Sequence, residues 1–432
     1  MTPQPSQSLQ LPDSNPALCQ AIAAAIAHSP HQRITFAEFM DLALYHPQYG
    51  YYVSHPKGIQ SDFFTSPHLG ADFGELLAEQ FVQMWELCDR PNPFTLVEMG
   101  AGQGLIVQDV LRYLHRHHFP CFEAIEYIII EKSAGLIAEQ KRRLQPLTQS
   151  GVRLSWKSWE EIESNSIVGC CFSNELVDAF PVHLFEVRSE QIQEVYVTEN
   201  DEPEVTESLN IIDPTEQQVE ISAEGFVTFQ RQRSTLPSQF KETIAPPSTA
   251  RLADYFQRIG LPLPQGYPDG YRSEVNLAAL DWLVLVADRL RQGYLLTIDY
   301  GYPAFRYYSP QRSGGTLQCY FQHAHHSNPY VAVGQQDITA HVDFTALEKQ
   351  GERCGLQTVG FTQQGLFLMA LGLGDRIAAL STPDSDQSLQ DVLRRRESLH
   401  ALINPMGLGN FGVLVQAKGL STRLPLRGLS GG

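Results

Sequence analysis

The chain has 432 residues, a length typical of two or three domains or of one domain enlarged by insertions. Its hydrophobic content of 43% can form a sizeable buried core, which excludes global disorder. With 31 Lys and Arg against 48 Asp and Glu, the formal net charge is -17, and so acidic a surface argues against nucleic acid as a partner.

Three further features concern the environment of the protein. No run of about 18 apolar residues occurs, which argues against membrane insertion. The 7 cysteines include no C-x-x-C pair, which argues for a reducing compartment and against a zinc site. Residues 1–16 contain no Lys or Arg, unlike a basic transit peptide. We therefore expect a cytoplasmic protein without a metal centre.

The N-terminal part is expected to form a disordered tail over residues 1–30 and a helical cover over residues 31–92. Thr35 precedes Glu38 by three residues, the spacing of a capping box at the start of a helix. A second helix follows, with apolar residues at helical spacing on one face, namely Phe73, Leu77, Phe81, Met84, Trp85 and Cys88. This stripe predicts a face packed against a core.

From residue 93 the pattern changes to short apolar strands that alternate with helices. We expect strands at 94–99, 127–130, 152–156, 167–173, 294–299, 356–361 and 411–417. Such alternation predicts a parallel sheet with helices on both faces. It is interrupted over 186–270 by an acidic insertion, so that the core comprises 93–185 and 271–420, followed by a flexible tail over 421–432.

A glycine-rich loop is the most informative segment. The residues Glu98-Met99-Gly100-Ala101-Gly102-Gln103-Gly104 follow an expected strand and precede an expected helix. Glycines let the backbone approach a ligand, and the helix N-terminus offers N–H groups. The spacing G-x-G-x-G after an acid differs from the dinucleotide fingerprint and from the phosphate-binding loop. A nicotinamide-dependent dehydrogenase is therefore disfavoured.

Acidic and amide side chains follow the neighbouring strands. Glu131 ends the second strand, where a carboxylate can accept both hydroxyls of a ribose. Together with the glycine loop it indicates a site for S-adenosylmethionine. Asn174 and Glu175 end the fourth strand, where buried polar groups usually meet a ligand, and Asp299 ends a later strand in the same way.

The sequence resembles the MidA-like family of class I methyltransferases, which includes a mitochondrial complex I assembly factor that methylates arginine. The blocks that carry the resemblance run in family order over about 45–345: YHPQYGYY from Tyr45, SDFFTSP from Ser61, FGE from Phe73, the glycine loop, SNELVDAFP from Ser173, DYG from Asp299, GGTL from Gly314 and DITAHVDF from Asp337. The glycine loop alone is common to all class I methyltransferases, whereas the combination is specific to this family.

The resemblance implies a Rossmann-like, seven-stranded, mostly parallel sheet that binds S-adenosyl-L-methionine. The residues implied in cofactor binding are Glu98, Gly100, Gly102, Gly104, Glu131 and Asn174, with Asp62 and Ser66 closing from the N-terminal block. This chain has Ser61 where the family often has Gly, and His68 where it often has Glu. These departures affect the pocket rather than the glycine loop.

The chemistry of an arginine acceptor points to carboxylates. A guanidinium has a pKa above about 12, so it must be oriented and must lose a proton as it attacks. Carboxylates can perform both tasks. Glu175 is the first candidate, assisted by Asn174, and the secondary candidates are Asp178, Asp299 and Asp343. Asp178 and Asp343 could equally cap the turns that follow them.

The resemblance implies that the protein substrate is a respiratory NADH dehydrogenase subunit that receives symmetric dimethylarginine. A methyltransferase for a small molecule or for another protein side chain is the alternative enzyme, because a fold does not determine the acceptor. A catalytically inactive assembly factor is the alternative from another class, and the intact glycine loop speaks against it. The sequence leaves the oligomeric state open, with a homodimer as one option.

Overall fold

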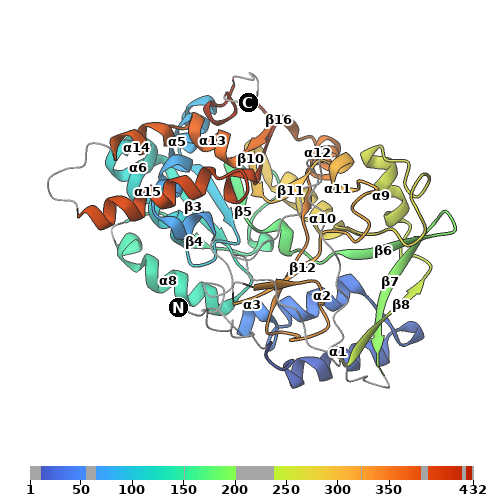
Figure 1. The fold of residues 1–432 in the computed structure, drawn as a ribbon. Coiled ribbons are helices and arrows are strands. Elements are labelled where there is room, and N and C mark those ends of the chain that lie inside the picture. The colour runs from blue at the N-terminus through green and yellow to red at the C-terminus, as the bar shows by residue number, and fades with distance from the viewer. Residues whose placement is uncertain are drawn as a thin grey trace, which may run out of the picture. The chain divides into compact units, whose positions relative to one another are not determined.

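The computed structural model describes residues 11–54, 65–149, 151–200, 238–322, 324–380, 388–420 and 425–430. Figure 1 shows the chain as a ribbon. The described residues form two compact units. Unit 1 comprises the described residues of Met1–Phe63, Ala179–Leu277 and Tyr308–His341. Unit 2 comprises those of Phe64–Asp178, Ala278–Tyr307 and Val342–Gly432. The expected boundaries of cover, insertion and core remain a prediction.

Unit 2 is built around a seven-stranded sheet. Its strands are β2 (Phe94–Met99), β3 (Ile125–Ile130), β4 (Leu154–Trp156), β5 (Ile167–Asn174), β10 (Leu290–Asp299), β16 (Gln357–Gln363) and β17 (Gly412–Lys418). They lie in the order β16-β17-β10-β5-β2-β3-β4. Strands β10, β5, β2, β3 and β4 pair in parallel, and β17 is antiparallel to both of its neighbours. The predicted seven-stranded, mostly parallel sheet is therefore confirmed.

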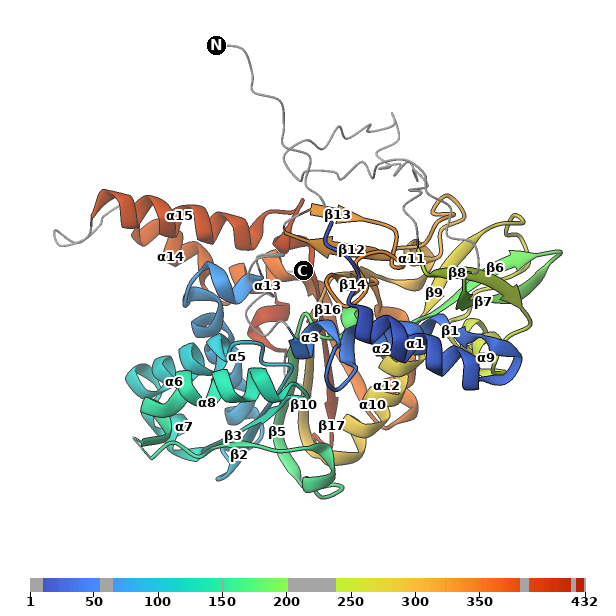
Figure 2. The same cartoon turned by 90° about the horizontal axis from the view of Figure 1, so that it is seen from below.

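Helices cover both faces of this sheet, with α5 and α6 on one face and α10 and α12 on the other (Figure 2). The helices of unit 2 are α5 (Asp72–Leu87), α6 (Leu105–His117), α7 (Phe119–Ala124), α8 (Ala134–Gln149), α10 (Leu277–Arg289, from the unit boundary), α11 (Ala304–Tyr307), α12 (Phe344–Arg353), α13 (Gln364–Ala370), α14 (Leu373–Ala379) and α15 (Leu389–Ile403). Short 3-10 turns are η2 (Ser66–Leu69), η3 (Trp159–Glu161), η4 (Val177–Ala179), η6 (Leu408–Asn410) and η7 (Arg427–Leu429). The pair β11 (Gly301–Tyr302) and β15 (Val342–Asp343) completes the unit.

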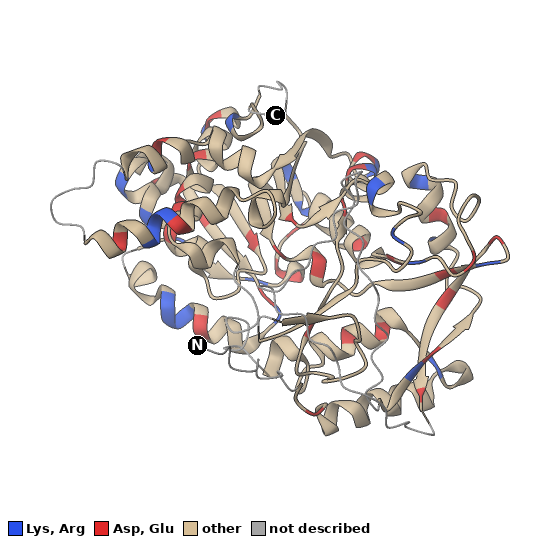
Figure 3. Cartoon of the chain, viewed as in Figure 1, with Lys and Arg blue, Asp and Glu red and all other residues tan. Residues whose placement is uncertain are grey.

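The basic residues of unit 2 are unevenly placed. Runs of three occur on α8, at residues 141–143, and on α15, at residues 394–396 (Figure 3). Residues 201–237 of the expected acidic insertion lie outside the described residues. None of the helices in the described part of the chain is long and apolar enough to cross a membrane. Within that part, no cluster of His, Cys, Asp and Glu suits a metal ion.

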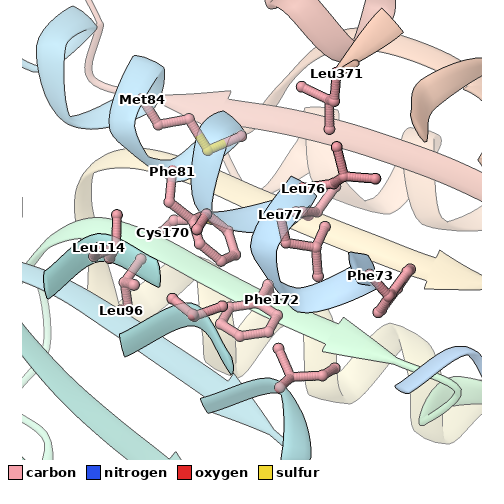
Figure 4. Packing of buried hydrophobic residues seen from close by; sticks show 14 of the residues in the cluster. Phe73, Leu76, Leu77, Phe81, Met84, Leu96, Leu114, Cys170, Phe172 and Leu371 are labelled. Carbon is pink, nitrogen blue, oxygen red and sulfur yellow. The ribbon is translucent and has the colours of Figure 1, made fainter. Parts of the chain in front are cut away.

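The core of unit 2 forms where the apolar face of α5 meets the sheet (Figure 4). Phe73, Leu77 and Phe81 lie on this face at four-residue spacing and are fully buried, as the sequence predicts. The ring of Phe81 lies 4.9 Å from that of Phe172 on β5, centroid to centroid. Truncating such a buried ring to Ala typically costs about 3–5 kcal/mol.

Unit 1 contains two smaller sheets and four helices in its described residues. One sheet pairs β1 (Ile34–Thr35), β7 (Gln191–Glu199), β6 (His183–Arg188) and β9 (Arg272–Val275), with β8 (Phe240–Ala245) also on β7. The other joins β13 (Ala324–His326), β12 (Gln318–Phe321) and β14 (Asp337–Thr339). The helices are α1 (Pro16–His28), α2 (Phe36–Tyr45), α3 (Tyr51–Ser54) and α9 (Arg251–Ile259), with a 3-10 turn η1 (Pro30–Gln32).

Unit 1 contains the predicted capping box at Thr35 and the GGTL block, and both are held by hydrogen bonds to a glutamate. Thr35 caps α2: its hydroxyl accepts from the N–H of Glu38 at 3.1 Å, and the Glu38 carboxylate accepts from the N–H of Thr35 at 2.7 Å. The GGTL block packs on the buried Glu274, whose carboxylate accepts from the N–H groups of Thr316 and Leu317. A Cβ at Gly315 would lie 2.1 Å from that carboxylate, and φ there is 76°, so a side chain would strain the backbone and displace the carboxylate.

Both predicted tails are wrong in part. Residues 16–28 form α1, whose buried residues Leu18, Ile22 and Ile26 recur at helical spacing. Asn15 caps this helix with its side-chain oxygen. In the C-terminal tail, Leu426 is fully buried. Apolar spacing over so short a segment is a weak signal, because packing against the rest of the protein decides whether a short helix forms.

Candidate functional site

The glycine loop adopts a backbone that favours glycine at three positions. Gly100, Gly102 and Gly104 have φ angles of 71°, 51° and 76°. The N–H of Gly100 donates to the carbonyl of Ile130 at 2.9 Å, which ties the loop to the end of β3. A Cβ at Gly102 would meet nothing within 4 Å, so this position faces open space. The loop ends at the first turn of α6 without a side-chain cap, which leaves backbone N–H groups for a ligand.

Glu98 lies inside the sheet rather than on the loop surface. It is the penultimate residue of β2 and is only 2% exposed. The hydroxyl of Tyr127 on β3 donates to its carboxyl at 2.5 Å. Burial, and secondarily the charge of Glu131, raise the pKa of Glu98 to about 8 despite this hydrogen bond. The hydrogen-bond partner of the Glu98 carboxyl is thus a side chain of the neighbouring strand β3.

Glu131 follows β3 directly, beside the glycine loop. One carboxylate oxygen, Oε1, accepts from the N–H groups of Lys132 at 2.9 Å and of Ser133 at 3.0 Å. The other, Oε2, is 3.4 Å from the side-chain nitrogen of Gln140. Burial raises the pKa of Glu131, and these donors oppose the rise. The carboxylate is therefore held in one orientation at the carboxyl edge of the sheet.

The segment after β5 forms a tight turn around the carboxylate of Asp299. Asp299 is fully buried, and its Oδ2 accepts from the N–H groups of Leu176, Val177 and Asp178 at 3.2, 2.9 and 3.3 Å. Its Oδ1 accepts from the N–H of Tyr300 at 2.9 Å. The predicted catalytic role of Asp299 is not reflected in these contacts, which serve to hold the backbone of the turn.

Asn174 and Glu175 stand at the start of this turn. The side-chain nitrogen of Asn174 donates to Glu175 Oε1 at 3.1 Å, and the buried Oδ1 of Asn174 has no protein partner. Glu175 has a φ of 51°, which is costly for a residue with a side chain and is frequent at functional sites. Burial, together with the carboxyl of Asp178, raises the pKa of Glu175 to about 8.

The glycine loop and this turn lie against each other. A Cβ at Gly100 would be 2.8 Å from Cδ1 of Leu176. Ser66, at the start of η2, lies near Glu175, whose pKa the Ser66 backbone lowers against the larger rise caused by burial. The hydroxyl of Ser66 instead pairs with the buried side chain of Gln364, at 3.1–3.2 Å.

The three remaining predicted residues are Asp343, Asp178 and Asp62. Asp343 caps α12 through an Oδ1 that accepts from the N–H of Ala346 at 3.2 Å, so this carboxylate takes the structural role. Asp178 is buried in η4 beside Glu175 and Asp299, whose pKa values are raised by burial and, secondarily, by the Asp178 carboxyl. Asp62 lies outside the described residues.

Gln140 on α8 belongs to the site although sequence reasoning did not select it. It is fully buried, and its side chain links the carbonyl of Gly102 to Glu131 and to Trp156. The signal was present, because Gln140 occupies the apolar face of α8 between Leu136 and Leu144, both buried. A polar residue on such a face usually has a specific partner.

A cavity of about 350 Å³ lies elsewhere in unit 2, between the start of α5 and α15. Asp72, Glu75, Arg394 and Arg395 are among its lining residues, and none of the predicted site residues lines it. Asp72 in this wall is paired with Arg376 and Arg395. The candidate site is therefore identified by backbone geometry and buried polar atoms, and not by this cavity.

The arrangement can hold a nucleoside that carries an amino-acid tail. Glu131 offers a fixed carboxylate to vicinal hydroxyls, and the open backbone at Gly102 admits close approach. The unpartnered oxygens of Ser173 and Asn174 offer hydrogen bonds at the adjacent strand end. Buried polar atoms without partners are uncommon in proteins, and a ligand is one explanation for them.

Comparisons with known proteins agree with this geometry. A family of S-adenosyl-L-methionine-dependent methyltransferases matches residues 76–362. The mitochondrial protein arginine methyltransferase NDUFAF7 of Rattus norvegicus is 26% identical over 400 residues, which cover 87% of this chain and 79% of that protein. The human NDUFAF7 is 25% identical over 401 residues, with 87% and 78% covered.

A solved structure is also similar over nearly the whole chain. It is a protein from Burkholderia thailandensis bound to S-adenosyl-homocysteine, 27% identical, with a TM-score of 0.77 and 98% of both chains covered. The resemblance recognised in the sequence is therefore confirmed.

The prediction of a cytoplasmic location is wrong by these comparisons, because the arginine methyltransferase relatives are named mitochondrial. That prediction depended on the lack of Lys and Arg in residues 1–16. The absence of one kind of targeting pattern does not decide the compartment, because such signals are read by receptors and not by the fold.

Proposed function

Because the chain belongs to this family of S-adenosyl-L-methionine-dependent methyltransferases, we propose that it methylates arginine in a protein substrate. The names of the NDUFAF7 relatives support the acceptor. The observation that carries the proposal is the pair Asn174–Glu175 at the carboxyl edge of the sheet, beside the glycine loop. Symmetric dimethylation, a respiratory NADH dehydrogenase subunit as substrate, and a homodimer are finer proposals that depend on the sequence resemblance.

The cofactor-binding residues are proposed as follows. The backbone of Gly100, Gly102 and Gly104 forms the cradle for the amino-acid end, with N–H groups at the start of α6. Glu131 accepts hydrogen bonds from the ribose hydroxyls, and the unpartnered Oδ1 of Asn174 accepts a hydrogen bond from the cofactor. Glu98 supports the loop from inside the sheet through Tyr127, and Ser66 lies near Glu175 with its hydroxyl paired to Gln364. Asp62 remains a proposal from the sequence.

When bound, S-adenosyl-L-methionine supplies a methyl group on a positively charged sulfur. Transfer by in-line displacement gains most from alignment of the acceptor nitrogen, which is a task of positioning. Glu175 can orient a guanidinium and take its proton, and Asn174 fixes the Glu175 carboxyl through a 3.1 Å hydrogen bond. A pKa near 8 makes this carboxyl a stronger base than an ordinary glutamate.

The cofactor site is tested with two glycine variants that share the same strain. Gly102→Ala and Gly260→Ala each place a Cβ in open space at a left-handed backbone, with φ of 51° and 74°. Each should lose about 1 kcal/mol of stability. Calorimetry with S-adenosyl-homocysteine should show loss of binding for Gly102→Ala only. Equal binding by both variants would contradict the site assignment.

The acceptor is tested by mass spectrometry of proteins from cells that lack this protein. We expect one or a few methylarginine sites to disappear, and to return when the wild-type chain is supplied. The Glu175→Gln variant should fail to restore them. Loss of methyl-lysine or methyl-glutamine in place of methylarginine would refute the arginine acceptor while leaving the methyltransferase intact.

A further inference from the structure

Helix α8 buries one amide side chain among apolar neighbours. Gln140 is 0% exposed and shares its helix face with the buried residues Leu136 and Leu144. Removing an amide from water carries a free-energy cost unless its hydrogen bonds are made inside the protein. The contacts of Gln140 therefore indicate what the residue is for.

The three contacts of Gln140 fix the direction of its amide. The indole nitrogen of Trp156 can only donate, and it lies 2.8 Å from Gln140 Oε1. The amide nitrogen must then face the other way, where it donates to the carbonyl of Gly102 at 2.8 Å and points at Glu131 Oε2 at 3.4 Å. One buried group thus links the glycine loop, the residue after β3 and the end of β4.

As a result, contacts at both carboxylate oxygens restrain the Glu131 side chain. Backbone N–H groups hold Oε1, and Gln140 stands at the Oε2 side. The 3.4 Å separation at Oε2 is long, which leaves this oxygen able to accept a stronger bond from a ligand hydroxyl. An acceptor fixed before binding gives more affinity than one that must be ordered on binding.

We propose that Gln140 is a positioning residue that sets Glu131 and the Gly102 backbone together for recognition of the cofactor ribose. The proposal rests on the proposed roles of Glu131 and Gly102. Loss of the Gln140 amide nitrogen releases both at once. Binding then loses its preference for an intact ribose as well as part of its strength.

The test compares S-adenosyl-homocysteine with its 2'-deoxy and 3'-deoxy analogues by calorimetry. The wild-type protein should prefer the intact ribose about tenfold or more, the factor expected for a hydrogen bond to a charged group. Gln140→Leu should weaken binding of S-adenosyl-homocysteine about tenfold. It should also reduce the preference over the analogues towards one. Gln145→Leu, on the exposed face of the same helix, is the matched control and should behave as wild type.

Gln140→Glu separates positioning from packing. It keeps an oxygen for the Trp156 indole but removes the donor to Gly102 and Glu131, so it should lose the preference at least as fully as Gln140→Leu. Wild-type preference in Gln140→Glu would overturn the proposal. So would an equal loss of affinity for all three ligands in Gln140→Leu, because that result indicates a purely structural role.

Three further outcomes are distinguishable. If Gln140→Leu does not fold, Trp156→Phe is the second variant, because it removes the indole donor that fixes the amide direction. This variant should reduce the ribose preference. An unchanged preference would then overturn the proposal. If the wild-type protein binds S-adenosyl-homocysteine without any ribose preference, the role of Glu131 fails, and the inference about Gln140 is refuted with it. Absence of all binding to the wild type would refute the cofactor site itself.

Discussion

Replacing Asp299 by Asn tests whether this carboxylate holds the turn that carries Asn174 and Glu175. In the wild type, four backbone N–H groups donate to its two oxygens, three of them to Oδ2. An asparagine offers one oxygen and one NH₂ group in the same space. Whichever way the amide is turned, at least one buried N–H group faces another donor.

The expected cost follows from these contacts. With the amide oxygen towards the three N–H groups of residues 176–178, only the N–H of Tyr300 loses its acceptor, which costs about 1–3 kcal/mol. The three remaining bonds keep an oxygen acceptor. The free energy of unfolding should therefore fall by about 1–3 kcal/mol.

Urea unfolding and methyl transfer should be measured together on Asp299→Asn. Asp343→Asn is the matched control, because Asp343 is also buried and its Oδ1 caps the following helix by accepting from the N–H of Ala346, a task that Asn performs well. We expect Asp299→Asn to lose stability and to lose kcat more than tenfold, and Asp343→Asn to change little. An unchanged unfolding midpoint with kcat lost would refute the structural role and favour direct catalysis by Asp299.

The other predictions concern two titrating carboxyls and one glycine. Glu98 has a pKa of about 8 in the folded chain against 4.5 as its ordinary value, so the native state keeps a proton that the unfolded chain has released. Stability should thus fall as pH rises from about 4.5 to 8, and urea titrations of Glu98→Gln should show a smaller fall. For Glu175, kcat/KM should rise with pH towards about 8, and Glu175→Gln should lower kcat about 10²–10⁴-fold with S-adenosyl-homocysteine binding retained in calorimetry. Gly315→Ala places a Cβ against the buried carboxylate of Glu274 and should lower the thermal midpoint, whereas Gly266→Ala, which meets nothing within 4 Å, should cost only backbone strain.

The sequence by itself determined the fold class and the position of the cofactor loop. Strand and helix periodicity, with glycines at 100, 102 and 104, are local properties of the chain, and local backbone chemistry allows few alternatives for them. The capping box at Thr35 was predicted for the same reason, because both of its hydrogen bonds join residues three apart.

Only the tertiary structure decided what each acid does. Asp299 and Asp343 are each the last residue of a strand, yet one holds the backbone of residues 176–178 and the other caps a helix. Those N–H groups lie more than a hundred residues from Asp299, so no spacing rule could connect them. Gln140 was overlooked for a related reason: its partners come from the glycine loop, from β3 and from β4, and only the folded sheet brings their edges together. Local patterns specify elements, whereas the role of a buried polar group depends on which donors the fold places around it.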